Sequence, residues 1–422
     1  MVTSKAELLS RRGRRGLGLI VLAVTVIVIA SFVYLHPNPP PKAKTTSPTP
    51  NLLPVSRLGD DVSYDFITPS MGWALVATTP GGQLQQFSVF RTVDGAKHWL
   101  KQLTGSQGVP VGFALPLKPF IKFFDKSNGF VVVPGLSDLV YRTTDGGAHW
   151  HSVVLPGPPG AVISFSDPSN GWLLVSASLT DQTVNLYGTS DGGGTWQHLP
   201  DPPPDVCIPV SAACALLAFG GDSVRQIPAL DGLGPAMARR AAITFRVASE
   251  GWIGGRGDPL PHVYSSSDGG RSWNRHDLPI PAFGLAPGAI ASVQLIPGTS
   301  VVASLDEGSG PDYPVTSFDG GASWNFVATP PTYGFTFRGS IGFQDAYNWW
   351  DTDGSTLFKS SDAGRTWSLS NNVLAGLFFW QFLDSKHWWG LFFGRGTAPG
   401  QGLASTADGG LHWTQSSVPD PA

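Results

Sequence analysis

The chain has 422 residues, which is enough for one large repeat domain or for two domains of ordinary size. Charged residues make up only 14%, whereas Gly (52) and Pro (37) are abundant, a composition typical of an all-β protein with many turns and not of a helical one. The formal net charge of −3 gives no electrostatic reason to expect a nucleic-acid partner.

An apolar segment near the N-terminus predicts a membrane anchor. Residues 16–35 read GLGLIVLAVTVIVIASFVYL, about the length that a helix needs to cross a bilayer. Arginines at 11, 12, 14 and 15 precede this segment, and only Lys42 and Lys44 follow it, further away. We therefore expect residues 1–15 in the cytoplasm and everything after 35 outside, at the cell surface or in the periplasm. A cleaved signal peptide is the alternative, although its apolar region is usually shorter and ends in a small-x-small site.

A linker follows the apolar segment. Residues 36–54 read HPNPPPKAKTTSPTPNLLP, a Pro- and Thr-rich stretch that cannot bury a core and favours an extended conformation. It is expected to act as a stalk between the membrane and a domain formed by residues 55–422.

One turn pattern then recurs seven times up to the C-terminus. Its common form is [ST]-x-D-x-G-x-x-W, and we call each copy an aspartate turn. The seven aspartates are Asp94, Asp145, Asp191, Asp268, Asp319, Asp362 and Asp408, and the seven tryptophans are Trp99, Trp150, Trp196, Trp273, Trp324, Trp367 and Trp413.

Each position of the aspartate turn has a physical role. Asp-Gly between two apolar stretches predicts a β-hairpin, because Gly adopts positive φ without a Cβ penalty. The carboxylate and the Ser/Thr hydroxyl can bond to backbone groups within the turn, and the Trp can cover it. The first copy has Ala96 where the others have Gly, so we expect its turn to be the least regular.

A second pattern, F-x-D-x-x-x-G-W, precedes most aspartate turns, and we call it the Phe–Trp turn. Six copies are found at 66–73, 124–130, 165–172, 245–252, 343–350 and 382–389, and residues 293–304 are a degenerate counterpart. Each unit then comprises four strands joined by these two turns. Successive aspartates are 43 to 51 residues apart, except for 77 residues between Asp191 and Asp268.

Repeats of this length with four strands each predict the blades of a β-propeller. The sequence thus indicates an all-β, seven-bladed propeller, with an insertion at about 202–240 between blades three and four. An eighth blade without an aspartate turn is the lesser alternative. An added strand from residues 52–62 could close the ring, but the sequence does not determine how closure occurs.

Two cysteines, Cys207 and Cys214, fall within the insertion. An extracytoplasmic location favours a local disulfide between them. Half of a metal site is the alternative, but no matching Cys/His pair lies nearby in the sequence. The nine histidines show no ligand spacing, so we expect neither a metal nor another cofactor.

The two turn patterns together resemble the Asp-box (BNR) propellers. The layout is similar to the photosystem II stability and assembly factors and their bacterial relatives, and sortilin-type receptors and sialidases share the Asp box alone. The resemblance covers roughly residues 55 to 420. It implies a non-catalytic assembly factor that binds a client protein, although nothing in the sequence identifies a photosystem as that client.

The alternative function is an exo-sialidase-like glycoside hydrolase. Such enzymes use three arginines, a Tyr paired with a Glu, and an Asp acid/base, and they carry an Arg-Ile-Pro motif that this chain lacks. The only glutamates are Glu7, Glu250 and Glu307, and hydrolases of this kind need two carboxylates facing one bond. We therefore predict a membrane-anchored binding or assembly scaffold without catalytic residues.

Two aromatic segments are candidates for partner binding. Tyr333, Phe335, Phe337 and Arg338 lie in one loop, and aromatic and Arg side chains are enriched at binding hot spots. Trp380 belongs to an aromatic run, for which we favour core packing because buried strands read as continuous apolar stretches. An exposed aromatic platform for a partner is the alternative. The partner is expected to be a protein or a cell-envelope polysaccharide, and the sequence does not indicate an oligomeric state.

Overall fold

The computed structural model describes residues 44–45, 50–51, 61–79, 84–109, 119–177, 183–206, 243–255, 260–280, 290–296, 298, 300–306, 313–328, 341–352, 356–372, 377–393 and 401–419. All of these belong to one compact unit, residues 42–422. The predicted membrane segment and the pair Cys207 and Cys214 lie outside the described residues. Within the described ranges, no helix has the length and apolar character needed to cross a membrane.

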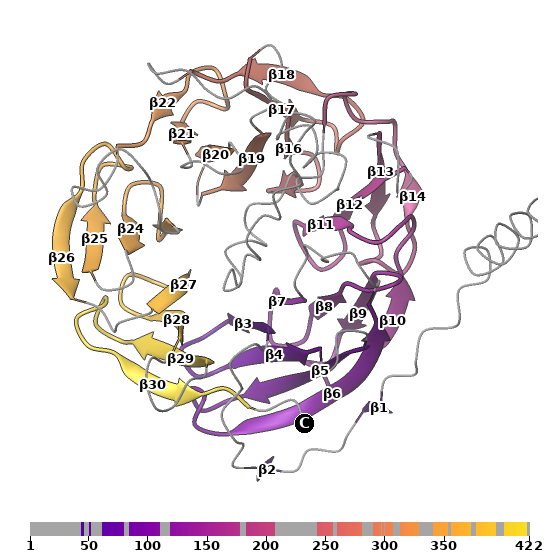
Figure 1. Cartoon of the computed structure of the whole chain (residues 1–422), viewed down its shortest axis with the longest axis vertical. Helices are drawn as coiled ribbons and strands as arrows, with labels where there is room; N and C mark the ends of the chain where they lie inside the picture. Colours follow the sequence, from indigo (N-terminus) through magenta and orange to yellow (C-terminus); the bar gives the residue numbers. More distant parts are fainter. Residues whose placement is uncertain are drawn as a thin grey trace, which may run out of the picture. The chain divides into compact units, whose positions relative to one another are not determined.

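Seven antiparallel sheets follow one another along the chain and are arranged radially around an axis (Figure 1). This confirms the predicted all-β, seven-bladed propeller. Each blade has four consecutive strands, numbered from the axis outwards, so that the chain fills one blade before starting the next.

The strands of the first four blades have the following bounds. Blade 1 contains β3 (Asp61–Phe66), β4 (Gly72–Thr78), β5 (Leu84–Thr92) and β6 (Trp99–Gly108); blade 2 contains β7 (Phe120–Phe123), β8 (Gly129–Val133), β9 (Leu139–Thr143) and β10 (His151–Val154); blade 3 contains β11 (Val162–Phe165), β12 (Gly171–Ser176), β13 (Val184–Thr189) and β14 (Gln197–His198); blade 4 contains β15 (Ile243–Phe245), β16 (Gly251–Gly254), β17 (His262–Ser266) and β18 (Asn274–Asp277).

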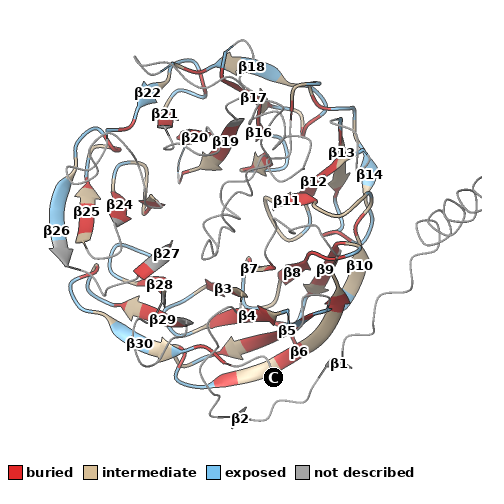
Figure 2. Ribbon diagram, viewed as in Figure 1, coloured by how far each residue is buried: buried red, intermediate tan, exposed pale blue. Residues whose placement is uncertain are grey.

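The last three blades complete the ring. Blade 5 contains β19 (Ile290–Leu295), β20 (Val301–Asp306), β21 (Tyr313–Ser317) and β22 (Asn325–Phe326); blade 6 contains β23 (Gly342–Phe343), β24 (Trp349–Thr352), β25 (Thr356–Ser360) and β26 (Ser368–Asn372); blade 7 contains β27 (Leu377–Phe382), β28 (Trp388–Phe393), β29 (Gln401–Thr406) and β30 (Thr414–Ser417). Buried side chains concentrate on the inner strands, and the described outermost strands of blades 3, 4, 5 and 7 are largely exposed (Figure 2).

The two turns of each blade lie on the same edge of the sheet. The amide of Gly95, in the first aspartate turn, donates to the carbonyl of Ser70, in the first Phe–Trp turn, at 2.9 Å. The same backbone bond joins the two turns in five other blades, from Gly146, Gly192, Gly269, Ala363 and Gly409. We call this edge of the ring the turn face, and the opposite edge, with the connections between blades, the loop face.

A stack of aromatic rings joins neighbouring blades. The Phe66 ring lies over Gly72 of its own blade, so closely that a Cβ on Gly72 would come within 2.4 Å of it. The other side of the same ring stacks on Trp389 of blade 7, with centroids 3.7 Å apart and planes 8° apart. Only a glycine leaves room for a ring in this position, which explains the Gly of the Phe–Trp turn.

The stack recurs around the ring. Phe123 stacks on Trp73 and Phe245 stacks on Trp172, each at 3.5 Å and 4°. The Phe–Trp turn of blade 2 was predicted to begin at Phe124, which is wrong by one residue, because Phe123 at the end of β7 is the stacked ring. Phe124 is half-buried and instead lies 5.9 Å from Phe130.

Blades 6 and 7 depart from the stack because Trp349 and Trp388 replace the glycine. In blades 1 to 4 the Phe ring lies directly over the glycine, a position that a tryptophan side chain blocks. Phe343 therefore meets Trp349 edge-on, at 4.8 Å and 89°, and Phe382 meets Trp388 at 5.0 Å and 66°. The larger side chain still fills the interface between blades, but with a different geometry.

The ring closes by side-chain contacts between complete blades. All four strands of blade 1 come from the N-terminal part of the domain and all four of blade 7 from the C-terminal part. The side-chain amide of Gln381 accepts from the Phe66 amide at 2.8 Å and donates to the Phe66 carbonyl at 2.9 Å. Trp99 Nε1 also donates to the carbonyl of Ser417 at 3.1 Å.

The described residues before Asp61 pair within blade 1 and not with blade 7. The short strands β1 (Lys44–Thr45) and β2 (Pro50–Asn51) pair with β6, on the outer edge of blade 1. The first strand of blade 1 starts at Asp61 and lies innermost. In the part of the chain that the structure describes, no strand is therefore shared between blades 1 and 7.

The beginning of the insertion is fixed to blade 4. Asp205 lies 2.5 Å from Nε2 of His262, a fully buried side chain, and accepts a hydrogen bond from the Tyr264 hydroxyl at 2.7 Å. Nδ1 of His262 donates to the carbonyl of Leu260 at 2.7 Å. Residues up to Val206 thus belong to the packed domain, since Val206 also pairs with Gly255.

Replacing Gly72 by Ala tests the stack between blades. The new methyl group is expected to displace Phe66 from Trp389 and to lower the free energy of unfolding by about 1–3 kcal/mol, the usual cost of overpacking. Urea unfolding of the full chain, followed by tryptophan fluorescence, measures this change.

Gly188→Ala is the matched control, because a Cβ there would meet only the flexible Leu199 side chain, at 3.1 Å. Equal destabilisation by the two substitutions would contradict this role of Gly72.

Candidate functional site

Each of the seven aspartate turns contains the same pattern of hydrogen bonds. In the third copy, Asp191 Oδ1 accepts from the amide of Thr195 at 2.9 Å and from the hydroxyl of Thr189 at 2.8 Å. Asp191 Oδ2 accepts from the hydroxyl of Thr195, also at 2.8 Å. The Thr189 hydroxyl in turn accepts from the amide of Gly193 at 2.9 Å. Both carboxylate oxygens are thereby engaged within the turn.

Three copies use histidine in place of the second hydroxyl. Nδ1 of His98, His149 and His412 lies 2.6 Å from the carboxylate of Asp94, Asp145 and Asp408, respectively. An ionised carboxylate only accepts hydrogen bonds, so Nδ1 carries the proton in each pair. The histidines are thus partners of the turn carboxylates, and the described residues contain no group of three or more metal-ligating side chains.

The first turn keeps this network despite Ala96. Ala96 adopts a φ of 62° and its amide donates to Thr92 Oγ1 at 3.0 Å, while the amide of His98 donates to Asp94 at 3.0 Å. The expectation that this turn would be the least regular is wrong for its hydrogen bonds. Ala363 of the sixth turn adopts a similar φ of 60°.

The hydrogen bonds keep the turn carboxylates ionised. The Thr195 amide, together with the hydroxyls of Thr189 and Thr195, lowers the pKa of Asp191 to about 2. The hydroxyl and amide of Ser272 lower the pKa of Asp268 to about 2 as well. A carboxylate that is ionised and satisfied by its own turn is a poor proton donor near neutral pH, which argues against its use as a catalytic acid.

The turns also form the joints between blades. Trp172 Nε1 donates to the carbonyl of Gly269 in the next blade at 2.9 Å, and Trp73 Nε1 donates to that of Gly146 at 3.3 Å. A Cβ on Gly321 of blade 5 would come within 2.7 Å of Trp252 of blade 4. The aspartate turns are therefore distributed around the ring, one at each seam.

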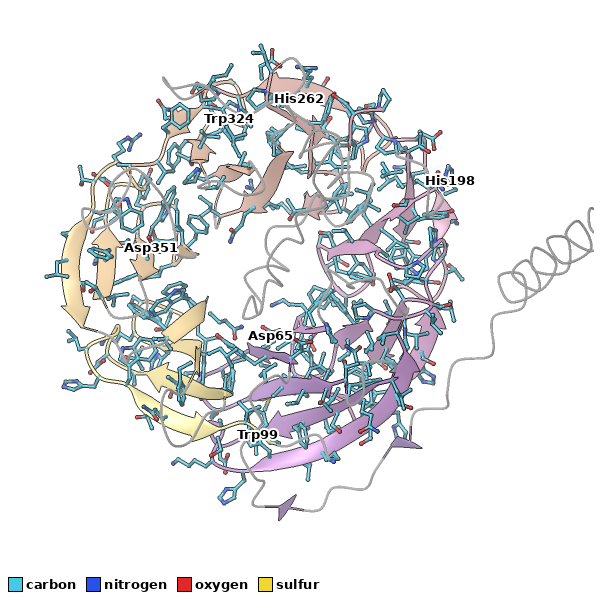
Figure 3. All side chains as sticks on the ribbon, viewed as in Figure 1. Asp65, Trp99, His198, His262, Trp324 and Asp351 are labelled. Carbon is cyan, nitrogen blue, oxygen red and sulfur yellow. The ribbon has the colours of Figure 1, made fainter. Side chains whose placement is uncertain are left out.

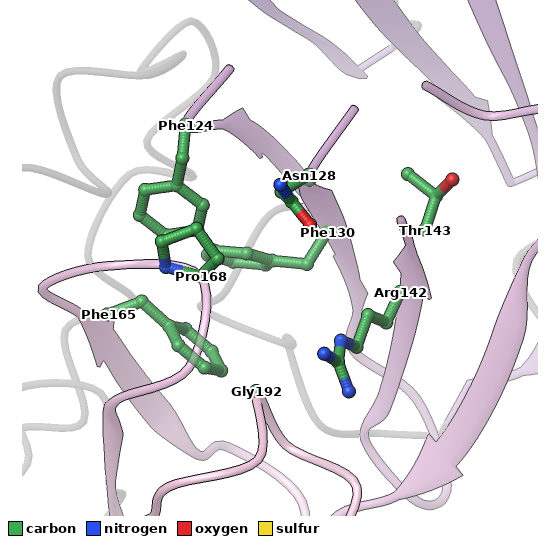
Figure 4. A pocket seen from close by; sticks show the side chains of 9 residues that line it. Phe124, Asn128, Phe130, Arg142, Thr143, Phe165, Pro168 and Gly192 are labelled. Carbon is green, nitrogen blue, oxygen red and sulfur yellow. The ribbon is translucent and has the colours of Figure 1, made fainter. Parts of the chain in front are cut away.

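A small pocket lies at the seam between blades 2 and 3 (Figure 4). Phe124, Phe130 and Phe165 form its apolar side, and the Arg142 guanidinium, which donates to the carbonyl of Asp191, forms its polar side. Its volume of about 10 Å³ corresponds to a single water molecule. It is too small for a sugar or a peptide side chain.

The inner strands present few charged groups to the axis. Asp65, which is 4% exposed and lies on the inner side of blade 1 (Figure 3), accepts from the amide of Phe123 at 2.6 Å and from Gln381 at 2.6 Å. Lys122 Nζ lies 3.2 Å from the same carboxylate. The described innermost strands contain no arginine, so they do not form the arginine triad of a sialidase. Glu250 is paired with Arg246 at 3.1 Å.

Of the predicted partner-binding residues, the structure describes only Trp380. Tyr333, Phe335, Phe337 and Arg338 lie outside the described residues. Trp380 is only 3% exposed and packs among Trp350, Trp388 and Trp413, so it cannot reach a partner and its assignment is corrected. The favoured interpretation of this aromatic run as core fits its burial, since Trp388 and Trp389 are buried too.

An exposed apolar pair on the loop face was not identified from the sequence. Leu84 of blade 1 is 42% exposed and Leu136 of blade 2 is 62% exposed. Leu84 pairs with Gly108 across the β5–β6 ladder, and the amide of Leu136 donates to the carbonyl of that same Gly108 at 2.8 Å. Both leucines thus adjoin one residue at the seam between blades 1 and 2. The one sequence feature that could have indicated this site is Leu136 itself, an apolar residue between Gly135 and Ser137 in a loop.

The chain is similar in fold to solved propellers. It shares 13% identity and a TM-score of 0.50 with the BP39L lectin from Burkholderia pseudomallei, over 85% of this chain and 98% of the lectin. YCF48 from Cyanidioschyzon merolae gives 16% identity and a TM-score of 0.46, over 86% and 99% of the two chains. YCF48 bound to a D1 peptide gives 15% and 0.44, over 86% and 96%.

Identities this low bear on the fold alone and not on ligands. No protein-family model matches the chain, and no curated protein matches it.

The turn carboxylates predict an acid-dependent loss of stability. Because the folded pKa of Asp191 and Asp268 is about 2, below the value of about 4 for an unfolded Asp, their stabilisation is complete above about pH 4 and is lost as the pH falls towards 2. The double variant Asp191→Asn/Asp268→Asn is expected to be less stable than wild type at pH 6.

The difference in unfolding free energy between wild type and the double variant should narrow steadily between about pH 4 and pH 2. Urea unfolding at a series of pH values measures it. A difference that stays constant down to pH 2 would contradict the role of the ionised carboxylates.

Proposed function

We infer that this protein is a binding or assembly scaffold that presents the loop face of its propeller to a protein partner, and that its aspartate turns and inner strands are non-catalytic. The seven aspartate turns serve as structural Asp boxes, in keeping with the resemblance of both turn patterns to the Asp-box propellers. Residues 16–35 form the anchor, and residues 36–54 hold the domain away from the membrane on its outer side. The disulfide between Cys207 and Cys214 is part of the same proposal.

Two exposed leucines, one in blade 1 and one in blade 2, carry this proposal. Leu84 and Leu136 come from different blades, yet both adjoin Gly108, and they expose 42% and 62% of their surface. Exposed apolar groups that cluster on one face are typical of protein interaction sites, whereas single ones are common everywhere.

The carboxylates of the turns and of the inner strands are arranged for structure and not for catalysis. The turn carboxylates are engaged with their own turns, and Asp65 is engaged with Phe123, Gln381 and Lys122. A polysaccharide is the second partner class, and it would bind through aromatic and polar groups instead of through two aliphatic side chains.

The double variant Leu84→Asp/Leu136→Asp tests the proposal. Crosslinking in intact membranes, followed by affinity purification of the full-length protein, should capture a partner protein with wild type. Capture by the variant should fall about tenfold or more, since disrupting a hot spot removes about 2 kcal/mol or more of binding energy.

Val93→Asp/Leu411→Asp is the matched control, because these residues are 61% and 60% exposed on the turn face. Equal capture by wild type and both variants would refute the loop-face site. Capture of glycan fragments instead of a protein would favour the polysaccharide alternative.

A further inference from the structure

A serine and a histidine form a hydrogen-bonded pair at the seam between blades 4 and 5. Ser265 lies on β17, directly before the fourth aspartate turn, and His276 lies on the neighbouring strand β18. Ser265 Oγ and His276 Nε2 are 2.7 Å apart. Nδ1 of the same imidazole lies 3.0 Å from the carbonyl of Gly321, in the aspartate turn of blade 5.

These two contacts fix the tautomer of His276. A backbone carbonyl only accepts hydrogen bonds, so Nδ1 carries the proton that is donated to Gly321. Nε2 of the neutral ring is then the acceptor, and the Ser265 hydroxyl donates to it. This is the order of groups in which an imidazole removes the proton of a serine, with a third group orienting the base.

The environment keeps the imidazole neutral. Desolvation lowers the pKa of His276, and the hydrogen bond to Gly321 opposes this only in part. The ring lies against Trp252, 5.2 Å away and itself 2% exposed, which supplies the apolar surroundings. Ser265 and His276 remain half-buried instead of fully enclosed, so that a small molecule in solution can approach the pair.

Ser265 and His276 lie beside Trp252, where blades 1 and 6 have a cationic side chain beside the equivalent tryptophan. Ser265 is the strand partner of Trp252, just as Arg91 and Lys359 are the strand partners of Trp73 and Trp350. Those two cations lie over the indoles, at 5.6 and 5.2 Å from the ring centroids. In blades 1 and 6 a long cationic side chain is enough to cover the indole. Covering Trp252 therefore does not explain why a serine and a histidine are found here.

We propose that Ser265 is a nucleophilic serine activated by His276, and that it takes small activated esters or phosphonyl compounds as substrates. The Ser265 oxygen forms a bond to the acyl carbon or phosphorus, and its proton moves to Nε2 of His276. The bond to the leaving group breaks, and an alcohol leaving group takes that proton from the imidazolium. The product is a serine ester, which water can hydrolyse by the reverse use of the same base.

Covalent labelling of the full-length protein with an alkyl fluorophosphonate tests the proposal. In this reaction the bond from phosphorus to fluorine breaks, and fluoride leaves. Mass spectrometry of the proteolysed protein is expected to find the phosphonyl group on Ser265. The substitution His276→Gln should lower the labelling rate about 100-fold or more, the usual contribution of a general base.

Ser267→Ala is the matched control, because Ser267 is an exposed serine two residues away with no histidine partner among the described contacts. This variant should be labelled on Ser265 at the wild-type rate, and Ser265→Ala should not be labelled at this site. Urea unfolding of each variant shows whether it is folded.

The pH dependence of the wild-type rate gives a second measurement that needs no substitution. With His276 as the base, the rate should reach a plateau at neutral pH and fall only where the imidazole becomes protonated. A rate that instead rises in proportion to hydroxide concentration, equal labelling of wild type and His276→Gln, or no labelling of Ser265 would each overturn the proposal.

Discussion

The packing of blades 1, 2 and 4 against the blade before each depends on a phenylalanine stacked between its own backbone and a tryptophan of that preceding blade. A four-stranded sheet has two faces to bury, and neither can be covered within one blade. The Phe66, Phe123 and Phe245 rings each lie over a glycine of their own turn and cover an aromatic ring of the neighbour. One short motif therefore sets both the local turn and the contact between blades.

The two turn patterns make different contacts between blades at the turn face. The Phe–Trp turn supplies the stacked rings, and the aspartate turn supplies carbonyls that accept from the tryptophans of the preceding blade, as Gly269 does from Trp172. With the turn face held by these contacts, the connections between blades on the loop face are free to vary in length and sequence, as the insertion after Asp205 does. This division between a face with repeated turns and a face with unequal connections supports the proposal that a partner binds at the loop face.

The sequence was sufficient for those features that arise within one repeat. The aspartate turns, the four strands in a blade and the number of blades all follow from contacts between residues a few positions apart, as between Thr189 and Gly193. Contacts between distant residues could not be predicted. The bonds of Gln381 to Phe66, of Asp205 to His262 and of Ser265 and His276 to Gly321 depend on how blades meet. Trp380 was ambiguous because a buried strand and an exposed aromatic platform have the same composition.

The most direct test of this account is a double-mutant cycle on Phe66 and Trp389, the stacked pair that closes the ring. Unfolding free energies of wild type, Phe66→Leu, Trp389→Leu and the double variant give the coupling between the two rings. If the stack joins blades 1 and 7, the coupling should be about 0.5–1.5 kcal/mol beyond the effects of burial. Additive effects, with a coupling below about 0.3 kcal/mol, would show that the blades are held together by other contacts and would contradict the account.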